Sequence, residues 1–299
     1  MQSQRSGAFH LSMVLLAFFF WGITPLYFKW LAHISAVELV VHRVIWSSFV
    51  LWGLLYASGL WSAFLDVWKE KGARTRLLFT SVLITGNWLV FVYAVLTGQT
   101  VEASLGYYIN PLVSIFLGAI FLKEQLTRLQ LLGVLMALSG VVAEIWTVGS
   151  LSWVALSLAI SFAVYGLSRK KLTLHPMVAL SAETTWMLPV ALLVMIAGTA
   201  TGDFVFFDGV VDFSLPLMLA GIVTVVPLLL YVTGLPGVTL IVAGFAQYIA
   251  PSMVFILAIT LFGEEVPTQR YYTFGLIWLA LIIISLEGVV KMKRSKTKL

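Results

Sequence analysis

The stretch TVEASLGYYINPLVSIFLGAIFLKEQLTRLQLLGVLMALSG, Thr100 to Gly140, decides the predicted fold. It is a long apolar run that carries an amide and a proline, Asn110 and Pro111, and it ends in a charged hairpin, residues 123–128, before a second apolar run. A proline inside a membrane helix removes one backbone hydrogen bond and leaves a carbonyl free for a partner or a ligand. The stretch therefore predicts two membrane helices joined by a short polar turn.

The same pattern returns at residues 239–285, TLIVAGFAQYIAPSMVFILAITLFGEEVPTQRYYTFGLIWLALIIIS. Corresponding residues lie 140 positions apart, and the matching pairs are Tyr108/Tyr248, Pro111/Pro251, Glu124/Glu264, Ala103/Ala243, Arg43/Glu183 and Trp46/Trp186. This constant offset predicts that the chain consists of two related halves, residues 1–150 and 151–299.

The composition is that of a membrane protein. Hydrophobic residues make up 61% of the chain and charged residues 10%, with a mean hydropathy of +1.01. A soluble protein normally carries about 25% charged residues, so the composition argues against a soluble enzyme. Cysteine is absent, which excludes disulfides and thiolate metal sites.

The apolar stretches are each close to the ~20 residues that cross a bilayer. We expect an all-α integral membrane protein with ten transmembrane helices, at roughly 11–31, 36–57, 77–97, 101–122, 129–147, 152–168, 176–198, 215–233, 239–262 and 271–290. Five spans per half is an odd number, so the second half is expected to enter the membrane inverted. Inverted repeats place a site near the midplane between the halves and permit alternating access.

Most of the 18 lysines and arginines fall on one side of these spans, which by the positive-inside rule predicts that both termini are cytoplasmic. The formal net charge of +5 then reflects basic loops facing anionic lipid, and we expect no nucleic-acid partner. Monomer and homodimer both stay open.

Four ionisable residues fall inside predicted spans: Glu38, His42 and Arg43 on the second, and Glu183 on the seventh. A charge at the centre of a membrane helix costs ~2.5–3.5 kcal/mol, so such residues usually face the bundle interior and find a partner. At ~1.5 Å per residue, Arg43 lies ~12 Å below the outer edge and Glu183 ~10 Å above the inner one. Two interpretations stay open: an ion pair between Arg43 and Glu183 that joins the halves, or substrate binding and proton coupling, with the proton as coupling ion.

Prolines within the spans, at Pro25, Pro111, Pro227 and Pro251, predict helix breaks, where transporters expose backbone to a ligand. Aromatic and amide side chains nearby are candidates to line a substrate cavity: Trp21, Tyr27, Asn87, Trp88, Tyr107, Tyr108, Asn110, Tyr165, Gln247 and Tyr248. The alternative is that the amides join helices to one another and that part of the aromatics belong to the interfacial belt.

Signatures of catalysis are missing from the sequence. No GxSxG, HExxH or phosphate-binding GxxxxGK[ST] occurs, and the four histidines are isolated from one another. We therefore predict no catalytic residue, no metal site and no cofactor.

Four blocks of the sequence resemble a known group: EASLGYYINPLVSIFLGAIFLKE, GNWLVFVYAV at Gly86–Val95, VELVVHRVIWS at Val37–Ser47 and YGLSRKK at Tyr165–Lys171. The chain resembles the EamA-type permeases of the drug/metabolite transporter superfamily, in the RarD branch, named for a chloramphenicol-sensitive protein. The resemblance implies a ten-helix bacterial inner-membrane transporter of two inverted halves, and efflux of metabolites or drugs.

The leading hypothesis is thus a secondary transporter of small organic molecules, with the substrate and membrane lipids as its partners. The alternative from another class is a membrane scaffold or sensor that transports nothing. An intramembrane enzyme is the third, and only Glu38, His42, Arg43 and Glu183 approach the cluster that it would need.

Overall fold

The computed structural model describes residues 7–97, 99–148, 152–206, 211–263 and 268–296, and within these ranges all regular structure is helical. The elements are α1 (Gly7–Trp30), α2 (Ala36–Ala57), α3 (Trp61–Lys69), α4 (Lys71–Leu96), α5 (Thr100–Phe121), α6 (Arg128–Val148), α7 (Trp153–Lys170), α8 (Pro176–Thr201), α9 (Val211–Gly234), the 3-10 turn η1 (Leu235–Gly237), α10 (Leu240–Gln247), α11 (Ile249–Thr260) and α12 (Thr268–Lys296).

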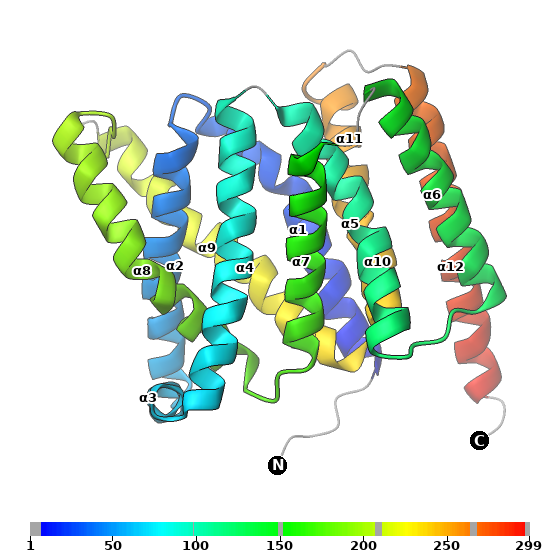
Figure 1. Ribbon diagram of the computed structural model, residues 1–299, viewed down its shortest axis with the longest axis horizontal. Helices are drawn as coiled ribbons and strands as arrows, with labels where there is room; N and C mark the ends of the chain where they lie inside the picture. Colours follow the sequence, from blue (N-terminus) through cyan, green and yellow to red (C-terminus); the bar gives the residue numbers. More distant parts are fainter. Residues whose placement is uncertain (1–6, 98, 149–151, 207–210, 264–267, 297–299) are drawn as a thin grey trace.

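The long helices lie side by side in one bundle, and the start of α1 and the end of α12 lie at the same end, the lower end in Figure 1. Seven of the described helices are long and apolar enough to cross a membrane: Gly7–Trp30, Ala36–Ala57, Glu102–Phe121, Arg128–Trp146, Pro176–Thr201, Ser214–Gly237 and Leu240–Thr260. The apolar part of α12, Tyr271–Glu287, is shorter. The expectation of an all-α multi-span membrane protein is therefore confirmed.

Helix α3 occupies a segment that the sequence left as a linker. In Figure 1 it is seen end-on at the lower edge of the bundle, crosswise to the long helices. Phe64 and Val67 are buried against α4 and α8, whereas Asp66 and Lys69 are exposed. A short helix with one apolar and one charged face suits the boundary between membrane and water.

The helices continue through Pro25, Pro111 and Pro227, so the expected breaks at these three prolines are wrong. A membrane helix tolerates proline when a neighbouring helix satisfies the freed backbone groups. Pro111 leaves the carbonyl of Tyr107 without its helical donor, and the adjacent carbonyl, that of Tyr108, accepts from the Tyr248 hydroxyl at 3.2 Å. Near Pro251 the helix does change, since α10 ends at Gln247 and α11 begins at Ile249.

Helices from residues 1–150 pack against helices from residues 151–299. Helix α5 packs on α7 and α1 on α11; α2 packs on α9 and α4 on α8; α1 packs on α9 and α4 on α7. Three further contacts join α2 to α8, α5 to α10, and α6 to α12. Gly221 allows the close approach of α9 to α2, because a Cβ there would lie 2.5 Å from the carbonyl carbon of Trp46.

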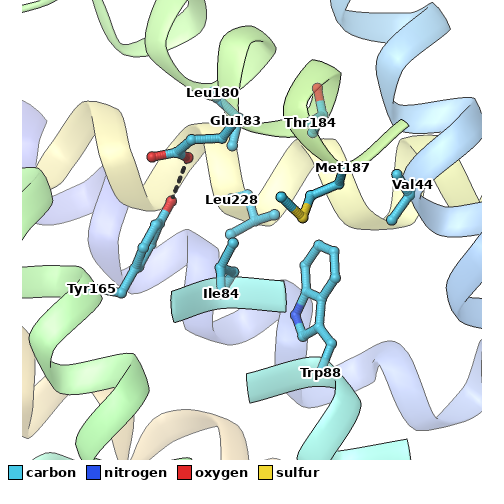
Figure 2. A pocket seen from close by; sticks show the side chains of 9 residues that line it. All are labelled: Val44, Ile84, Trp88, Tyr165, Leu180, Glu183, Thr184, Met187 and Leu228. Carbon is cyan, nitrogen blue, oxygen red and sulfur yellow. Dashed lines mark hydrogen bonds between the residues drawn. The ribbon is translucent and has the colours of Figure 1, made fainter. Parts of the chain in front are cut away.

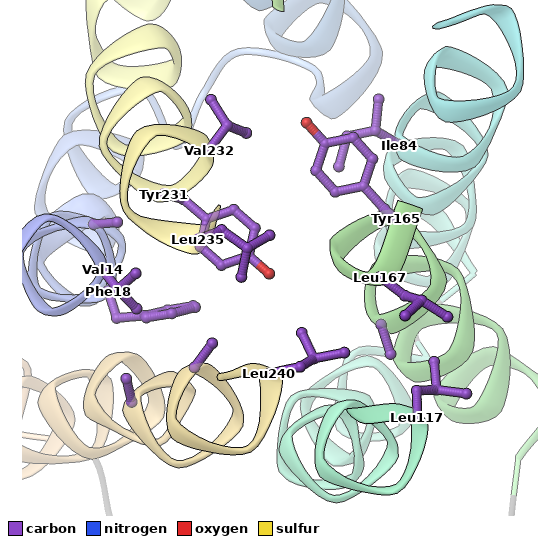
Figure 3. Packing of buried hydrophobic residues seen from close by; sticks show 14 residues of the cluster. Val14, Phe18, Ile84, Leu117, Tyr165, Leu167, Tyr231, Val232, Leu235 and Leu240 are labelled. Atoms are coloured by element: carbon purple, nitrogen blue, oxygen red, sulfur yellow. The ribbon is translucent and has the colours of Figure 1, made fainter. Parts of the chain in front are cut away.

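The largest apolar core lies where α1, α4, α5, α7, α9 and α10 meet (Figure 3). Side chains from these elements point toward one another, with Phe18, Tyr165 and Tyr231 among the buried members. The ring centroids of Phe18 and Tyr231 are 5.6 Å apart in an edge-to-face arrangement, which favours aromatic packing. Tyr165 of this core also takes part in the second of the two charged clusters described next.

Candidate functional site

Helix α2 carries the first charged cluster. Ser35 caps the helix, because its hydroxyl accepts from the backbone N–H of Glu38 at 3.1 Å. The Arg43 Nε donates to the hydroxyl of Thr224 on α9 at 2.9 Å. The guanidinium carbon lies 4.9 Å from the ring centre of Trp88 on α4 and 5.9 Å from that of Phe28 on α1. Arg43 therefore connects three neighbouring helices.

Glu38 and His42 lie one turn apart on α2, and both are buried. One Glu38 carboxylate oxygen accepts from the backbone N–H groups of Val205 and Phe206, each at 3.0 Å, and lies 3.9 Å from His42 Nε2. The indole N–H of Trp46 donates to His42 Nδ1 at 3.0 Å. Glu38 thus anchors the segment after α8, and a role in proton coupling stays a prediction.

Helix α8 carries the second cluster, centred on Glu183. Its carboxylate accepts from Arg169 Nη1 at 3.2 Å, from the Thr80 hydroxyl at 2.5 Å and from the Tyr165 hydroxyl at 3.1 Å. The side chains of Arg169 and Glu183 are 3% and 2% exposed. Thr80 belongs to α4, so this carboxylate also joins helices from distant parts of the chain.

The expected pair between Arg43 and Glu183 is not formed, and Arg169 is the partner of Glu183. Arg169 is the first of three consecutive basic residues, 169–171, at the end of α7. The connection from α7 to α8 is short, and Arg169 Nη2 also donates to the carbonyl of Pro176, the first residue of α8, at 3.3 Å. Tyr165 and Arg169 are four residues apart and therefore lie on the same face of α7. This spacing is the sequence signal that could have identified the face of α7 that binds Glu183.

A small cavity lies beside the second cluster (Figure 2). Its lining is largely apolar, and its volume is on the order of that needed to hold one water molecule. Trp88 faces Met187 across it, and the hydrogen bond between Tyr165 and Glu183 lies at its other side. The lining residues are Val44, Ile84, Trp88, Tyr165, Leu180, Glu183, Thr184, Met187 and Leu228.

The predicted amide residues connect helices. Asn87 donates to the carbonyl of Leu158 and to the hydroxyl of Ser161, both at 2.9 Å, and so joins α4 to α7. Gln247 donates to the Ser114 hydroxyl at 3.0 Å, and that hydroxyl donates to Asn110 Oδ1 at 3.4 Å. The amides act here as interhelical hydrogen bonds.

Five of the predicted aromatics lie outside the cavity lining. Tyr108 and Tyr248 are buried in the apolar cluster of α5, α6, α7, α11 and α12. Trp21 packs on the ring of Tyr231, with centroids 5.8 Å apart, and the Tyr27 hydroxyl donates to the Pro216 carbonyl at 2.9 Å.

Tyr107, by contrast, is 48% exposed. Together with Tyr27 it lies within electrostatic range of Arg43. The structure therefore gathers Trp88, Tyr165 and Glu183 around the cavity, and Tyr27, Trp88 and Tyr107 around Arg43.

The lower end of the bundle has its own polar contacts. Lys123 takes a positive φ of 54° at the end of α5, and the backbone N–H of Glu124 returns to the Gly118 carbonyl at 3.2 Å. The Glu124 carboxylate then accepts from the N–H groups of Leu240 and Ile241, at 2.8 and 2.9 Å, at the start of α10. The equivalent Glu264 falls outside the described residues.

Lys170 adds to this lower end. Its ammonium donates to the backbone carbonyl of Val238 and, at 3.3 Å, to that of Leu235. The ends of α5, α7 and η1 and the start of α10 are thereby held together. A bundle of long apolar helices with buried charges that link them defines a multi-pass helical membrane protein.

Comparison with known proteins gives a narrower class. The EamA-like transporter family matches residues 8–144. The chain is 42% identical to "Protein RarD" of Salmonella typhi, over 94% of this chain and 96% of that one. It is 39% identical to an "Uncharacterized transporter" of Vibrio cholerae, over 93% and 92% of the two chains. It is 27% identical to the "Chloramphenicol-sensitive protein RarD" of Pseudomonas aeruginosa, over 90% and 91%.

Solved structures share the fold, among them a crystal structure with a TM-score of 0.69 and 16% identity that covers 93% of this chain and 96% of its own. The chain belongs to the EamA-like transporter family and, within it, to the RarD branch. It is thus a multi-pass bacterial membrane transporter of the drug/metabolite superfamily, in agreement with the resemblance noted in its sequence.

Proposed function

We propose that the protein is a secondary transporter, a permease or exporter, of small organic molecules in the bacterial inner membrane. It works by alternating access around a site between two inverted five-helix halves, residues 1–150 and 151–299. In this proposal ten helices cross the membrane, α10 and α11 count as one crossing, and both termini are cytoplasmic.

One observation carries this proposal: the main contacts between the two halves map onto one another when the halves are exchanged. The repeat pairs α1 with α7, α2 with α8, α4 with α9, α5 with α10 and α11, and α6 with α12. Under that exchange the contact of α5 with α7 becomes that of α10–α11 with α1, and the contact of α2 with α9 becomes that of α8 with α4. Contacts of α2 with α8, of α5 with α10 and of α6 with α12 map onto themselves.

The two charged clusters follow the same exchange. Arg43 on α2 binds Thr224 on α9, and Glu183 on α8 binds Thr80 on α4. Each charge, at the same offset in its half, therefore reaches a threonine of the other half. Contacts of this kind across an interface are those that alternating access must break and remake.

Counterflow tests the proposal. Purified protein in liposomes would be loaded with a mixed metabolite pool and chloramphenicol, the compound that the name of the Pseudomonas aeruginosa relative contains. We expect accelerated exchange of at least one labelled solute relative to protein-free liposomes. A scaffold or sensor, the alternative, predicts no solute exchange from correctly folded protein.

A further inference from the structure

The surrounding residues satisfy only part of the hydrogen-bonding capacity of the Arg43 guanidinium and do not neutralise its charge. In the described part of the chain its single hydrogen bond runs from Nε to Thr224, and neither terminal nitrogen has an acceptor. No carboxylate among these residues comes within ion-pair distance of it. Arg169 differs, because its terminal nitrogens bind the Glu183 carboxylate and the Pro176 carbonyl.

A charge without an ionic partner inside a membrane span is unfavourable, and such residues usually mark the path of a substrate or ion. The Nε hydrogen bond to Thr224 fixes the orientation of the guanidinium plane. Its two terminal nitrogens can then donate two parallel hydrogen bonds, a fork-like geometry that matches the two oxygens of a carboxylate. The geometry is therefore that of an anion-binding position.

The walls around this fork are aromatic. Trp88 and Phe28 present their rings to the guanidinium, and Tyr27 and Tyr107 lie within electrostatic range of it. Trp88 also lines the cavity that ends at Glu183. The negative charge of Glu183 is already balanced by Arg169, so the positive charge of Arg43 is the one left for a ligand.

We propose that Arg43 binds the anionic group of a small aromatic organic anion, such as an aryl carboxylate, while the ring of that ligand lies against Trp88 and Phe28. This inference rests on the proposed transport function and names the substrate class of that site. Thr224 acts as a positioning residue, since it orients the guanidinium.

Three probes of similar size differ in charge: phenylacetate is anionic, phenylacetamide is neutral and phenethylamine is cationic. Binding to the purified full-length protein would be followed by tryptophan fluorescence and by the shift in thermal unfolding. Hydrogen bonds to charged groups typically change affinity by about tenfold or more. We expect wild-type protein to bind phenylacetate at least about tenfold more tightly than either of the other probes.

Substitutions of Arg43 test whether this residue causes the preference for phenylacetate. We expect Arg43→Gln to bind phenylacetate and phenylacetamide equally, and Arg43→Lys to retain part of the preference as a point charge. Arg74→Gln, at an exposed position near the start of α4, removes an equal charge and should leave the preference unchanged. The comparison of probes on wild-type protein stands even if Arg43→Gln does not fold.

Equal binding of phenylacetate and phenylacetamide to wild-type protein would overturn the inference, as would an unchanged preference in folded Arg43→Gln. Counterflow of the mixed metabolite pool is measured on the same preparation. Solute exchange without preference for the anion rejects the anion site and leaves transport standing. Anion preference without any exchange rejects transport instead.

Discussion

Arg169 and Glu183 form an ion pair that is almost fully buried, and removal of one partner strands the other charge. Loss of one member of a buried pair costs ~3–5 kcal/mol. We expect Arg169→Met and Glu183→Gln each to lower the thermal unfolding midpoint in detergent. The double variant should lose less than the sum of the two, because neither charge is then left unpaired.

The pair of Asp66 and Lys69 on α3 is the matched control. Its atoms are 2.8 Å apart, yet its side chains are 66% and 76% exposed. Exposed pairs contribute little because water and salt screen them. Asp66→Asn and Lys69→Met should each change the midpoint only slightly, and additive losses for Arg169 and Glu183 would contradict the pairing.

The hydroxyl of Tyr248 supports the backbone next to Pro111 by its bond to the Tyr108 carbonyl. Removal of a buried neutral hydrogen bond costs about 1 kcal/mol. Tyr248→Phe should therefore lower the thermal midpoint measurably. Tyr56→Phe, at a position 81% exposed, should leave it unchanged, and an equal effect of both substitutions would reject this role for Tyr248.

The sequence alone identified Arg43 and Glu183 as buried charges, because a charged side chain within an apolar span is expected to face the interior of the bundle rather than lipid. It did not identify their partners. Arg169 stands among basic residues at the end of its helix, and only the fold reveals that the start of α8 comes back beside it. Thr80 and Thr224 are common in helices, and nothing in their sequence context separates them from other threonines.

At the level of the helices, the interface between α2 and α9 depends on Gly221. A Cβ at this position would lie within 2.5 Å of the Trp46 backbone, and overpacking of this kind typically costs ~1–3 kcal/mol. Gly221→Ala should therefore reduce thermal stability. Gly53→Ala, on α2 with nothing within 4 Å, should raise it by up to ~1 kcal/mol, since alanine favours helix. Equal effects would contradict the close packing.

Helix positions were largely predictable, because apolar length decides them in a membrane protein. The prolines were not, since whether a proline interrupts a helix depends on its neighbours. The backbone beside Pro111 receives a hydrogen bond from Tyr248, which is distant in the sequence, and no local pattern shows this. Helix α3 was missed for a related reason. At nine residues it is too short to give a spanning signal, and its two faces become evident only against α4 and α8.

At the scale of the whole molecule, Glu124 and Lys170 join the lower ends of α5 and α7 to η1 and the start of α10, an arrangement that we call closed. Leu240 is fully buried behind them. We expect Leu240→Cys to resist a small water-soluble thiol reagent in the otherwise unchanged protein. It should become reactive when combined with Glu124→Ala, because α10 then loses the carboxylate at its start.

Tyr56→Cys, at an exposed position at the end of α2, should react in both backgrounds and so reports equal access of the reagent. Leu240→Cys that stays equally protected with and without Glu124 would mean that this carboxylate does not hold the lower end closed. Leu240→Cys that reacts fully in both would contradict the closed arrangement itself.

The single charge of Arg43 has an electrical consequence. An elementary charge that crosses the full membrane potential exchanges ~2.3 kcal/mol per 100 mV. A bound anion cancels that charge, so the reorientation of the loaded carrier does not depend on the membrane potential. The empty carrier keeps the positive charge, so its reorientation does depend on the potential. We expect one-for-one exchange of phenylacetate to be insensitive to a potassium diffusion potential, and net efflux, which returns the carrier empty, to respond to it. Equal voltage sensitivity of the two would place the moving charge elsewhere than Arg43.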